Sequence, residues 1–227
     1  MAIPFAYDEY FIDVVVCVDV SANMAPIFEK TKQTIQSLSS RIINSMEEVG
    51  YDVNQLRMKI IAFRDYGSDC DPMTESPFYT FPDQSMEFSS FVDSLEAKGG
   101  DGPTNALEAI ALALKSDWIT GGFRRRHVVF VFTDSPTLPL GARANHPSYP
   151  QGMPANLSEL EAWWDNQVPG STYQHRAGRL IAFVPEESPW TNLQAWNRYW
   201  SVFFDAGIGL LETDIQQAIE VCFHPDI

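Results

Sequence analysis

Residues 11–23 read Phe-Ile-Asp-Val-Val-Val-Cys-Val-Asp-Val-Ser-Ala-Asn, and they are the most informative part of the chain for its architecture. Positions 11–18 are rich in β-branched residues and almost continuously apolar, which is typical of a strand buried on both faces of a parallel sheet. The predicted strand ends at Asp19, and Ser21 and Asn23 follow at alternating positions. We therefore expect three oxygen-bearing side chains to converge above the carboxyl edge of a sheet.

A second strand of the same kind is predicted at 127–133, where Val-Val-Phe-Val-Phe follows His127. This strand also ends on a carboxylate, that of Asp134. In doubly wound sheets, ligands bind outside the carboxyl ends of the strands, at the switch in strand order. Asp19 and Asp134 should therefore lie at one binding edge.

Helical patterns alternate with these strands along the chain. From about Pro26 to Val49, apolar residues recur every three or four positions, and Gly50 ends the predicted helix. Because proline donates no ladder hydrogen bond, the segment from Pro77 to Pro82 can supply only a short edge strand, which we expect to be antiparallel. The remaining elements are expected as strands at 57–63, 179–184 and either 201–204 or 207–211, and as helices at 86–95, 104–116, 193–199 and from 213 onward.

This alternation predicts an α/β fold with a doubly wound, mostly parallel, Rossmann-like sheet, one antiparallel edge strand, and helices on both faces. The chain has 227 residues and no visible internal boundary, so we expect a single domain over 1–227. Residues 1–10 are interpreted as an N-terminal extension. Residues 135–156 contain five prolines and no periodic pattern, and they predict a long loop.

The composition argues against several classes of partner. Lys and Arg number 15 against 30 for Asp and Glu, and the formal charge of −15 opposes contact with nucleic acid or anionic lipid. The run Arg124–Arg126 is interpreted as a solvated entry to the strand that follows. No apolar stretch reaches the ~18 residues of a membrane span. Three cysteines without CxxC spacing, and a first segment without a basic region, favour a cytoplasmic location.

The oxygen atoms of Asp19, Ser21 and Asn23 suit a hard cation. Mg²⁺ takes oxygen ligands in octahedral geometry and keeps several waters, so hydroxyls, an amide and a few carboxylates match its chemistry. Mn²⁺ and Ca²⁺ are alternatives. The same residues are also typical of a helix N-cap, which needs no metal. The four histidines are scattered without a pair at ligand spacing, and we expect them to cap strands or face solvent.

Residues 19–24, Asp-Val-Ser-Ala-Asn-Met, resemble the DxSxS-M signature of the metal-ion-dependent adhesion site of von Willebrand factor A domains. Three later segments resemble, in order and rough spacing, the YRD, GGDGPE and TDAPP segments of intracellular A domains. They are Ala62–Tyr66, Gly99–Pro103 and Thr133–Pro136. The pattern is most similar to the A domains attached to alpha-type kinases and to bacterial tellurite-resistance-associated proteins. The resemblance covers about 11–134 well and 180–222 weakly.

This resemblance implies that Ser21 and Asn23 are direct ligands of the metal, with Thr104 standing where relatives carry Thr or Glu. Asp19 and Asp134 would bind the metal directly or through water. The sixth position would stay open for a carboxylate from a partner protein. Asparagine departs from the family's usual second serine, and its carbonyl reaches further than a hydroxyl, which bears on metal affinity and specificity.

Four other residues have weaker assignments. Asp65 and Asp101 are expected either to contact a metal-bound water or to cap a turn. The loop 135–156 leaves from the metal edge, so we expect it to frame the partner surface with Tyr149 and Met153. A mobile surface loop is the alternative interpretation.

The implied function is a metal-dependent protein–protein interaction module that is not an enzyme. A metal-dependent phosphatase or phosphotransferase is the main alternative, because aspartyl-phosphate enzymes keep their nucleophile at the end of the first strand. The second acid that such chemistry needs is replaced here by Ser21, and the GxSxG, GxxxxGK[ST] and HExxH motifs do not occur. A metal-free scaffold with the same fold is a third alternative.

Overall fold

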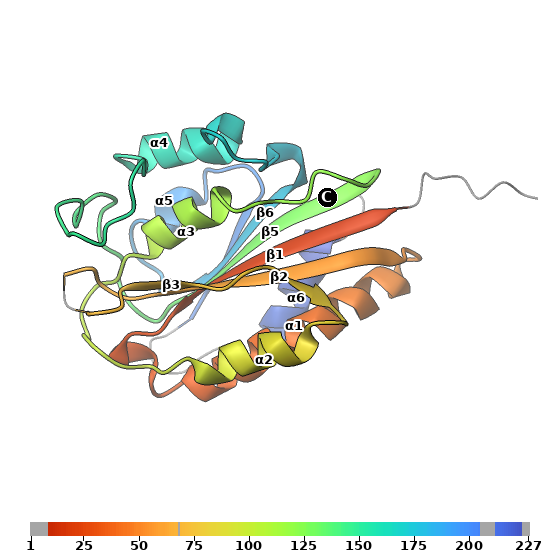
Figure 1. Ribbon diagram of the computed structural model, residues 1–227, viewed down its shortest axis with the longest axis horizontal. Helices are drawn as coiled ribbons and strands as arrows, with labels where there is room; N and C mark the ends of the chain where they lie inside the picture. Colours follow the sequence, from red (N-terminus) through yellow and green to blue (C-terminus); the bar gives the residue numbers. More distant parts are fainter. Residues whose placement is uncertain (1–8, 68, 205–211, 224–227) are drawn as a thin grey trace, which may run out of the picture.

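Strand β1, Tyr10–Asp19, lies at the centre of the sheet, as its sequence predicts (Figure 1). Its residues from Ile12 to Asp19 have no exposed surface. It pairs in parallel with β2, Val53–Phe63, on one side and with β5, Arg124–Phe132, on the other. These elements are seen in a computed structural model, which describes residues 9–67, 69–204 and 212–223.

Over the described residues, the sheet has seven strands in the order β3-β2-β1-β5-β6-β7, and β4 also pairs with β2. Strands β6, Gly178–Val184, and β7, Tyr199–Phe203, continue the parallel pairing. Strands β3, Met73–Glu75, and β4, Tyr79–Phe81, run antiparallel to β2. The predicted fold class is confirmed, although two short antiparallel strands replace the expected one. Sequence reasoning missed β3 because three residues show no alternation.

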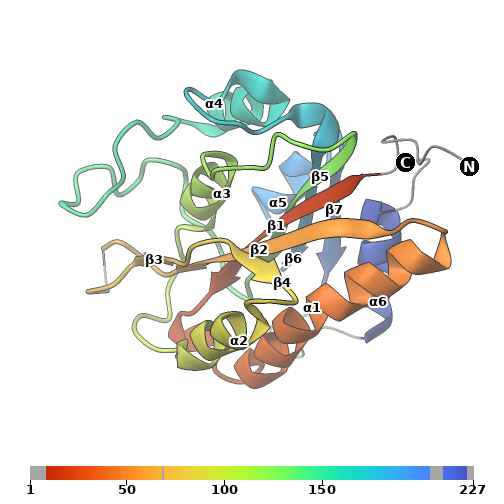
Figure 2. The ribbon, with the colours of Figure 1, turned by 45° about the vertical axis from the view of Figure 1, so that its right-hand side comes forward.

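Helices cover both faces of the sheet (Figures 1 and 2). One face carries α1, Phe28–Glu48, α2, Ser85–Ser94, and α6, Glu212–Phe223. The other face carries α3, Ala106–Leu114, α4, Leu157–Ala162, and α5, Trp190–Leu193. Short helical turns span Ala22–Met24, Trp163–Gln167 and His175–Ala177.

Each face of the sheet has its own apolar core, and β1 contributes to both. Val14, Val16 and Val18 belong to the cluster on the α1 side. Val15 and Cys17 belong to the cluster on the α3 side. This alternation explains why the sequence of β1 is apolar at nearly every position.

The long helix α1 matches its prediction closely. It begins at Phe28, and Gly50 follows its end with a φ of 83°, a conformation that glycine adopts without steric cost. Of the predicted extension 1–10, residues 1–8 lie outside the described part of the chain, and Tyr10 already belongs to β1.

The interpretation of Arg124–Arg126 was wrong. These residues are the first three of β5 and are not an entry before it, because they pair with the start of β1. Arg124 and Arg126 place their guanidinium groups over the rings of Tyr51 and Tyr10, respectively. Aromatic rings thus replace solvent as part of the surroundings of these cations.

The helix predicted at 193–199 was also largely wrong. Helix α5 ends at Leu193, the chain turns at Arg198 with a φ of 58°, and Tyr199 begins β7. Strand β7 agrees with the 201–204 alternative for the last strand, whereas 207–211 lies outside the described residues. Helix α4 was not predicted. No helix among the described residues is long and apolar enough to cross a membrane.

The parallel register brings the carboxyl ends of the central strands together. Val18 of β1 is level with Phe132 of β5, so Asp19 and Thr133 leave neighbouring strands side by side. The Thr133 amide donates to the carbonyl of Phe183 at 3.1 Å, which adds β6 to the same edge. Residues 19–23 and 133–135 are therefore neighbours.

Candidate metal centre

The centre of the carboxyl edge is the Asp19 carboxylate, which is completely buried. Its Oδ1 accepts from the Ser21 amide at 2.8 Å. Its Oδ2 accepts from the Thr133 hydroxyl at 2.6 Å and from the Thr104 hydroxyl at 3.4 Å. Three segments that are distant in the sequence thus meet at one carboxylate.

Ser21 and Asn23 converge on Ser135. The hydroxyl oxygens of Ser21 and Ser135 are 3.4 Å apart, and the Asn23 amide nitrogen donates to the Ser135 hydroxyl at 3.1 Å. Ser21 occupies the N-cap position of the turn Ala22–Met24 but makes no side-chain capping hydrogen bond. Helix capping therefore does not explain this serine, although the Asp19 carboxylate does accept the amide two residues on, as a capping side chain would.

Thr104 is held by the loop that follows β5. Its amide donates to Pro136 O at 2.9 Å, and its carbonyl accepts from Leu138 N at 2.8 Å and from the Thr137 hydroxyl at 3.1 Å. Asp134, 8% exposed, lies in the same segment directly after Thr133. The five predicted ligands thus come from three loops that meet at one edge.

The chemistry of this cluster fits a hard cation. Burial raises the pKa of Asp19, and the interactions that oppose the rise are hydrogen bonds from Thr133, Ser21 and Ser135. Each of these donors is neutral, so a cation would stabilise the ionised carboxylate more than they do. The described residues hold no group of three or more His, Cys, Asp and Glu suited to a metal. A site here must use hydroxyl and amide oxygens, which hard cations accept.

Residues 14–136 match the sequence model of the von Willebrand factor type A domain. The chain belongs to this family. No curated protein matches it.

Two crystal structures of the pilus adhesin SpaC from Lactobacillus rhamnosus GG share the fold of this A domain, with TM-scores of 0.54 and 0.53. Their sequence identities are 10% and 14%, and they cover 93% and 92% of this chain. This chain spans only 30% of the length of either adhesin chain.

Sequence reasoning missed three residues that build the site of this A domain. Thr133 and Ser135 flank Asp134 and contact Asp19 and Ser21, respectively. Arg64 donates from its guanidinium to four carbonyl oxygens on three loops, those of Val20, Asp71, Glu96 and Lys98. The Thr-Asp-Ser-Pro and Phe-Arg-Asp segments were the available signals, because they recur in the family pattern.

The weaker candidates occupy other roles in the structure. The Asp65 carboxylate accepts from the Gly67 amide at 2.9 Å, as a turn cap does, and forms a two-pronged ion pair with Arg143 at 2.7 and 2.8 Å. The Asp101 side chain is exposed, while its carbonyl accepts from Asn23 at 2.8 Å. These contacts support the turn-cap interpretation for Asp65.

The loop 135–156 is fastened to the body of the A domain. The Tyr149 hydroxyl and the Gly141 amide both donate to Glu108 Oε1 at 3.0 Å, and the rings of Tyr149 and Tyr66 lie 5.3 Å apart. Met153 is partly buried against the α3-side core. The loop therefore packs on the domain at these points, and a partner role for Tyr149 and Met153 stays a prediction.

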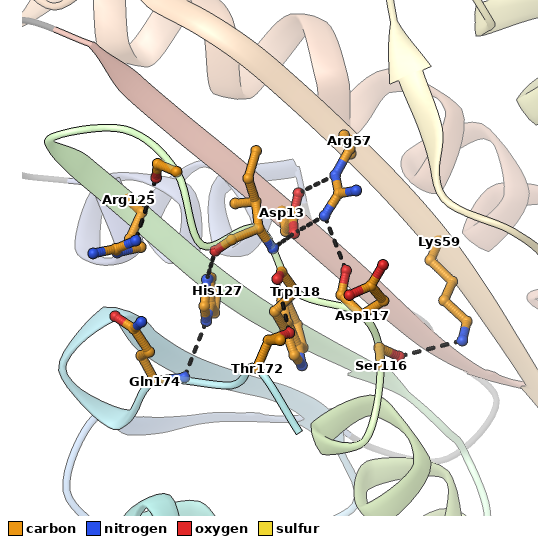
Figure 3. Close-up of polar contacts among 12 residues, drawn as sticks. Asp13, Arg57, Lys59, Ser116, Asp117, Trp118, Arg125, His127, Thr172 and Gln174 are labelled. Atoms are coloured by element: carbon orange, nitrogen blue, oxygen red, sulfur yellow. Dashed lines mark hydrogen bonds and ion pairs between the residues drawn. The ribbon is translucent and has the colours of Figure 1, made fainter. Parts of the chain in front are cut away.

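A second buried polar cluster lies at the amino ends of the strands (Figure 3). Asp13 is fully buried and accepts from Arg57 at 2.8 and 2.6 Å and from the Ile119 amide at 2.7 Å. His127 lies beside it, stacked on Trp118 with ring centroids 4.9 Å apart. Here the protein supplies its own cation, in contrast to the surroundings of Asp19.

Proposed function

We propose that this A domain holds Mg²⁺ at the carboxyl edge of its sheet and binds an acidic side chain of a partner protein there. Mn²⁺ and Ca²⁺ are the alternative ions. The proposed ligands are Asp19, Ser21, Asn23, Thr104 and Asp134, and the Asn23 amide, whose nitrogen now donates to Ser135 and to the Asp101 carbonyl, would turn to present its oxygen. The observation that carries the proposal is the complete burial of Asp19 among neutral hydrogen-bond donors.

The partner chemistry follows from the charges in this set. Only two carboxylates, those of Asp19 and Asp134, lie in this set, and the other three donors are neutral. With one of the two carboxylates bound through water, the divalent ion keeps a net attraction for another anion. When bound, Mg²⁺ would supply positive charge and an octahedral demand for oxygen that five protein groups leave incomplete. A partner carboxylate is the natural sixth oxygen, because it adds charge-assisted binding that water cannot give.

We also propose that the module is not an enzyme and that it works in the cytoplasm. Ser21 occupies the position where an aspartyl-phosphate enzyme would keep its second acid. The fold is shared with part of a pilus adhesin, and the analogy supports a binding role. The three cysteines are unpaired thiols, as a reducing compartment favours.

The test is a pair of thermal melts of the wild type and Asp19→Asn, with and without Mg²⁺, at constant ionic strength. At ~100 times its dissociation constant, the ion should stabilise the wild type by about 2.7 kcal/mol. Asn keeps the shape of the side chain but removes the buried charge, so the variant should fold without metal and lose the Mg²⁺ response.

The control is Asp83→Asn, which removes the same charge from an exposed position away from the site and should retain the full response. A wild type that responds to neither Mg²⁺, Mn²⁺ nor Ca²⁺ would leave the metal-free scaffold as the correct alternative.

A further inference from the structure

A small pocket opens at the same edge of the sheet as the candidate metal centre. It has a volume of about 320 Å³ and lies between helix α3, the loop after β5 and the loop after β6. Leu107, Leu140 and Leu157 supply much of its apolar wall, and Pro189 and Asn192 belong to the side formed by the β6–α5 segment. This volume is near the lower end of the ~300–1,000 Å³ typical of small-ligand sites, so a side chain fits better than a large cofactor.

Thr137 connects the pocket to the metal centre. It lines the pocket, and its hydroxyl donates to the carbonyl of Thr104, one of the proposed ligands, at 3.1 Å. The loop after β6 begins beside the centre as well, because the Thr133 amide bonds to Phe183 near the end of β6. One short segment of a partner could therefore reach both.

Among the described residues, the pocket is lined by no charged side chain, although the chain has a net charge of −15. By contrast, the pocket between α1 and α6 is lined by Glu48 and Glu220. A neutral, leucine-rich pocket rejects a charged side chain, because burial without a counter-charge is costly. It accepts an aliphatic one, whose burial is favourable.

We propose that the partner segment pairs its acidic residue with a nearby aliphatic side chain, leucine, isoleucine or methionine, which inserts into this pocket. The inference rests on the proposed function, and it assigns the specificity of the module to the pocket. The acidic residue would give metal dependence, and the aliphatic residue would distinguish one acidic segment from another.

The test selects peptides from a randomised displayed library on the wild-type protein with Mg²⁺, in parallel with Asn192→Trp and Asp19→Asn. Asn192 is exposed at the pocket, so an indole there fills the space without entering the core. The wild type should enrich peptides with an acidic residue close to an aliphatic one. Asn192→Trp should keep the acidic preference and lose the aliphatic preference.

Calorimetry then measures the affinity of one selected peptide for the wild type and for each variant. Replacing its aliphatic residue by glycine, or Asn192 by tryptophan, should weaken binding by about tenfold to a hundredfold. Gln194→Trp, at an exposed position just after the end of α5 and outside the pocket lining, is the matched control and should change the affinity by less than about twofold.

The outcomes separate the two proposals. Acidic peptides without any aliphatic preference would overturn the pocket assignment and keep the metal function. Aliphatic peptides that bind equally to Asp19→Asn and resist a chelator would overturn the metal function, and with it the coupled recognition proposed here.

Discussion

Asp13 and Asp19 lie near opposite ends of β1, and neither carboxylate has any exposed surface. Asp13 is held by the guanidinium of Arg57, its neighbour on β2. Asp19 is held by the amide of Ser21 and the hydroxyls of Thr133 and Thr104. The same residue type, on the same strand, is compensated by charge at one end and by neutral donors at the other.

This difference separates a structural role from a binding role. A buried carboxylate with its own guanidinium has no need of an external cation, and at the amino end that pair also fastens the loop from Asp117 to Ile119. A buried carboxylate among hydroxyls keeps an electrostatic demand that a bound cation would meet. Substitutions at the amino end of β1 should therefore change stability, and those at the carboxyl end should change metal binding.

The largest effect is expected from Arg57→Met. The substitution keeps an apolar stem beside Phe78, over whose ring the guanidinium now lies at 4.5 Å, but leaves the Asp13 carboxylate buried without its cation. Removing one partner of a buried pair costs about 3–5 kcal/mol. Urea unfolding at pH 7 measures the loss, and Mg²⁺ should still stabilise the variant if the two ends act independently.

Two further variants sharpen this result. Adding Asp13→Asn to Arg57→Met removes the uncompensated charge and should recover part of the lost stability. Lys98→Met, which breaks the exposed pair with Glu96, should have no measurable effect. If Arg57→Met unfolds at the same urea concentration as the wild type, the amino-end pair is not the structural anchor described here.

The second effect is an acid sensitivity that originates at the amino end. Burial, together with the nearby charges of Arg125 and Arg57, lowers the pKa of His127 to about 4. The Gln174 amide donates to Nδ1 at 3.2 Å, and Nε2 lies 3.0 Å from the Ile119 carbonyl, an arrangement that suits the neutral ring. Protonation would break the bond from Gln174.

Because folding lowers the pKa of His127, the protein should lose stability as the pH falls. The unfolded chain takes up a proton near pH 6.5 and the folded chain only near pH 4, so stability is complete above 6.5 and falls as the pH drops through this window. The loss amounts to about 3 kcal/mol. His127→Gln, which cannot titrate, should flatten the urea-unfolding profile between pH 6.5 and 4, and parallel profiles would contradict the assignment.

The comparison also shows how much of the fold the sequence predicts. The apolar runs of β1 and β5 fixed the central parallel pair, since strands buried on both faces leave a continuous signal. The antiparallel edge strand β3 was harder to predict, because it is only three residues long and contributes little burial. Arg124–Arg126 were interpreted as a solvated strand entry, since their strand character depends on pairing with the start of β1 and on aromatic partners distant in the sequence.

The candidate site was predictable to a similar extent. The carboxyl ends of two central strands located Asp19 and Asp134, the alternating positions after Asp19 added Ser21 and Asn23, and the family pattern added Thr104. Ser135 was missed as a contact, because its role arises only when the loop after β5 folds back toward the first loop.

The smallest effect predicted here concerns Thr104, the neutral donor at a position where relatives carry Thr or Glu. Its hydroxyl lies 3.4 Å from the Asp19 carboxylate, and the loop after β5 holds its backbone in place. Thr104→Glu would add a third carboxylate to the set, making the carboxyl end more like a self-sufficient cation site. Metal affinity depends on the count of charged ligands, so we expect Mg²⁺ to bind about tenfold more tightly, equivalent to about 1.4 kcal/mol.

Thr104→Glu should also weaken binding of the partner, because the new carboxylate supplies the negative charge that the partner would have brought. Calorimetry measures both equilibria, with Mg²⁺ alone and then with an acidic peptide selected on the wild type. Thr104→Ala serves as the second variant, since it removes the hydroxyl without adding charge and should weaken Mg²⁺ binding. If Thr104→Glu raised the metal affinity yet preserved or strengthened peptide binding, the partner could not be reaching the metal through a carboxylate, and it would have to dock elsewhere on the domain.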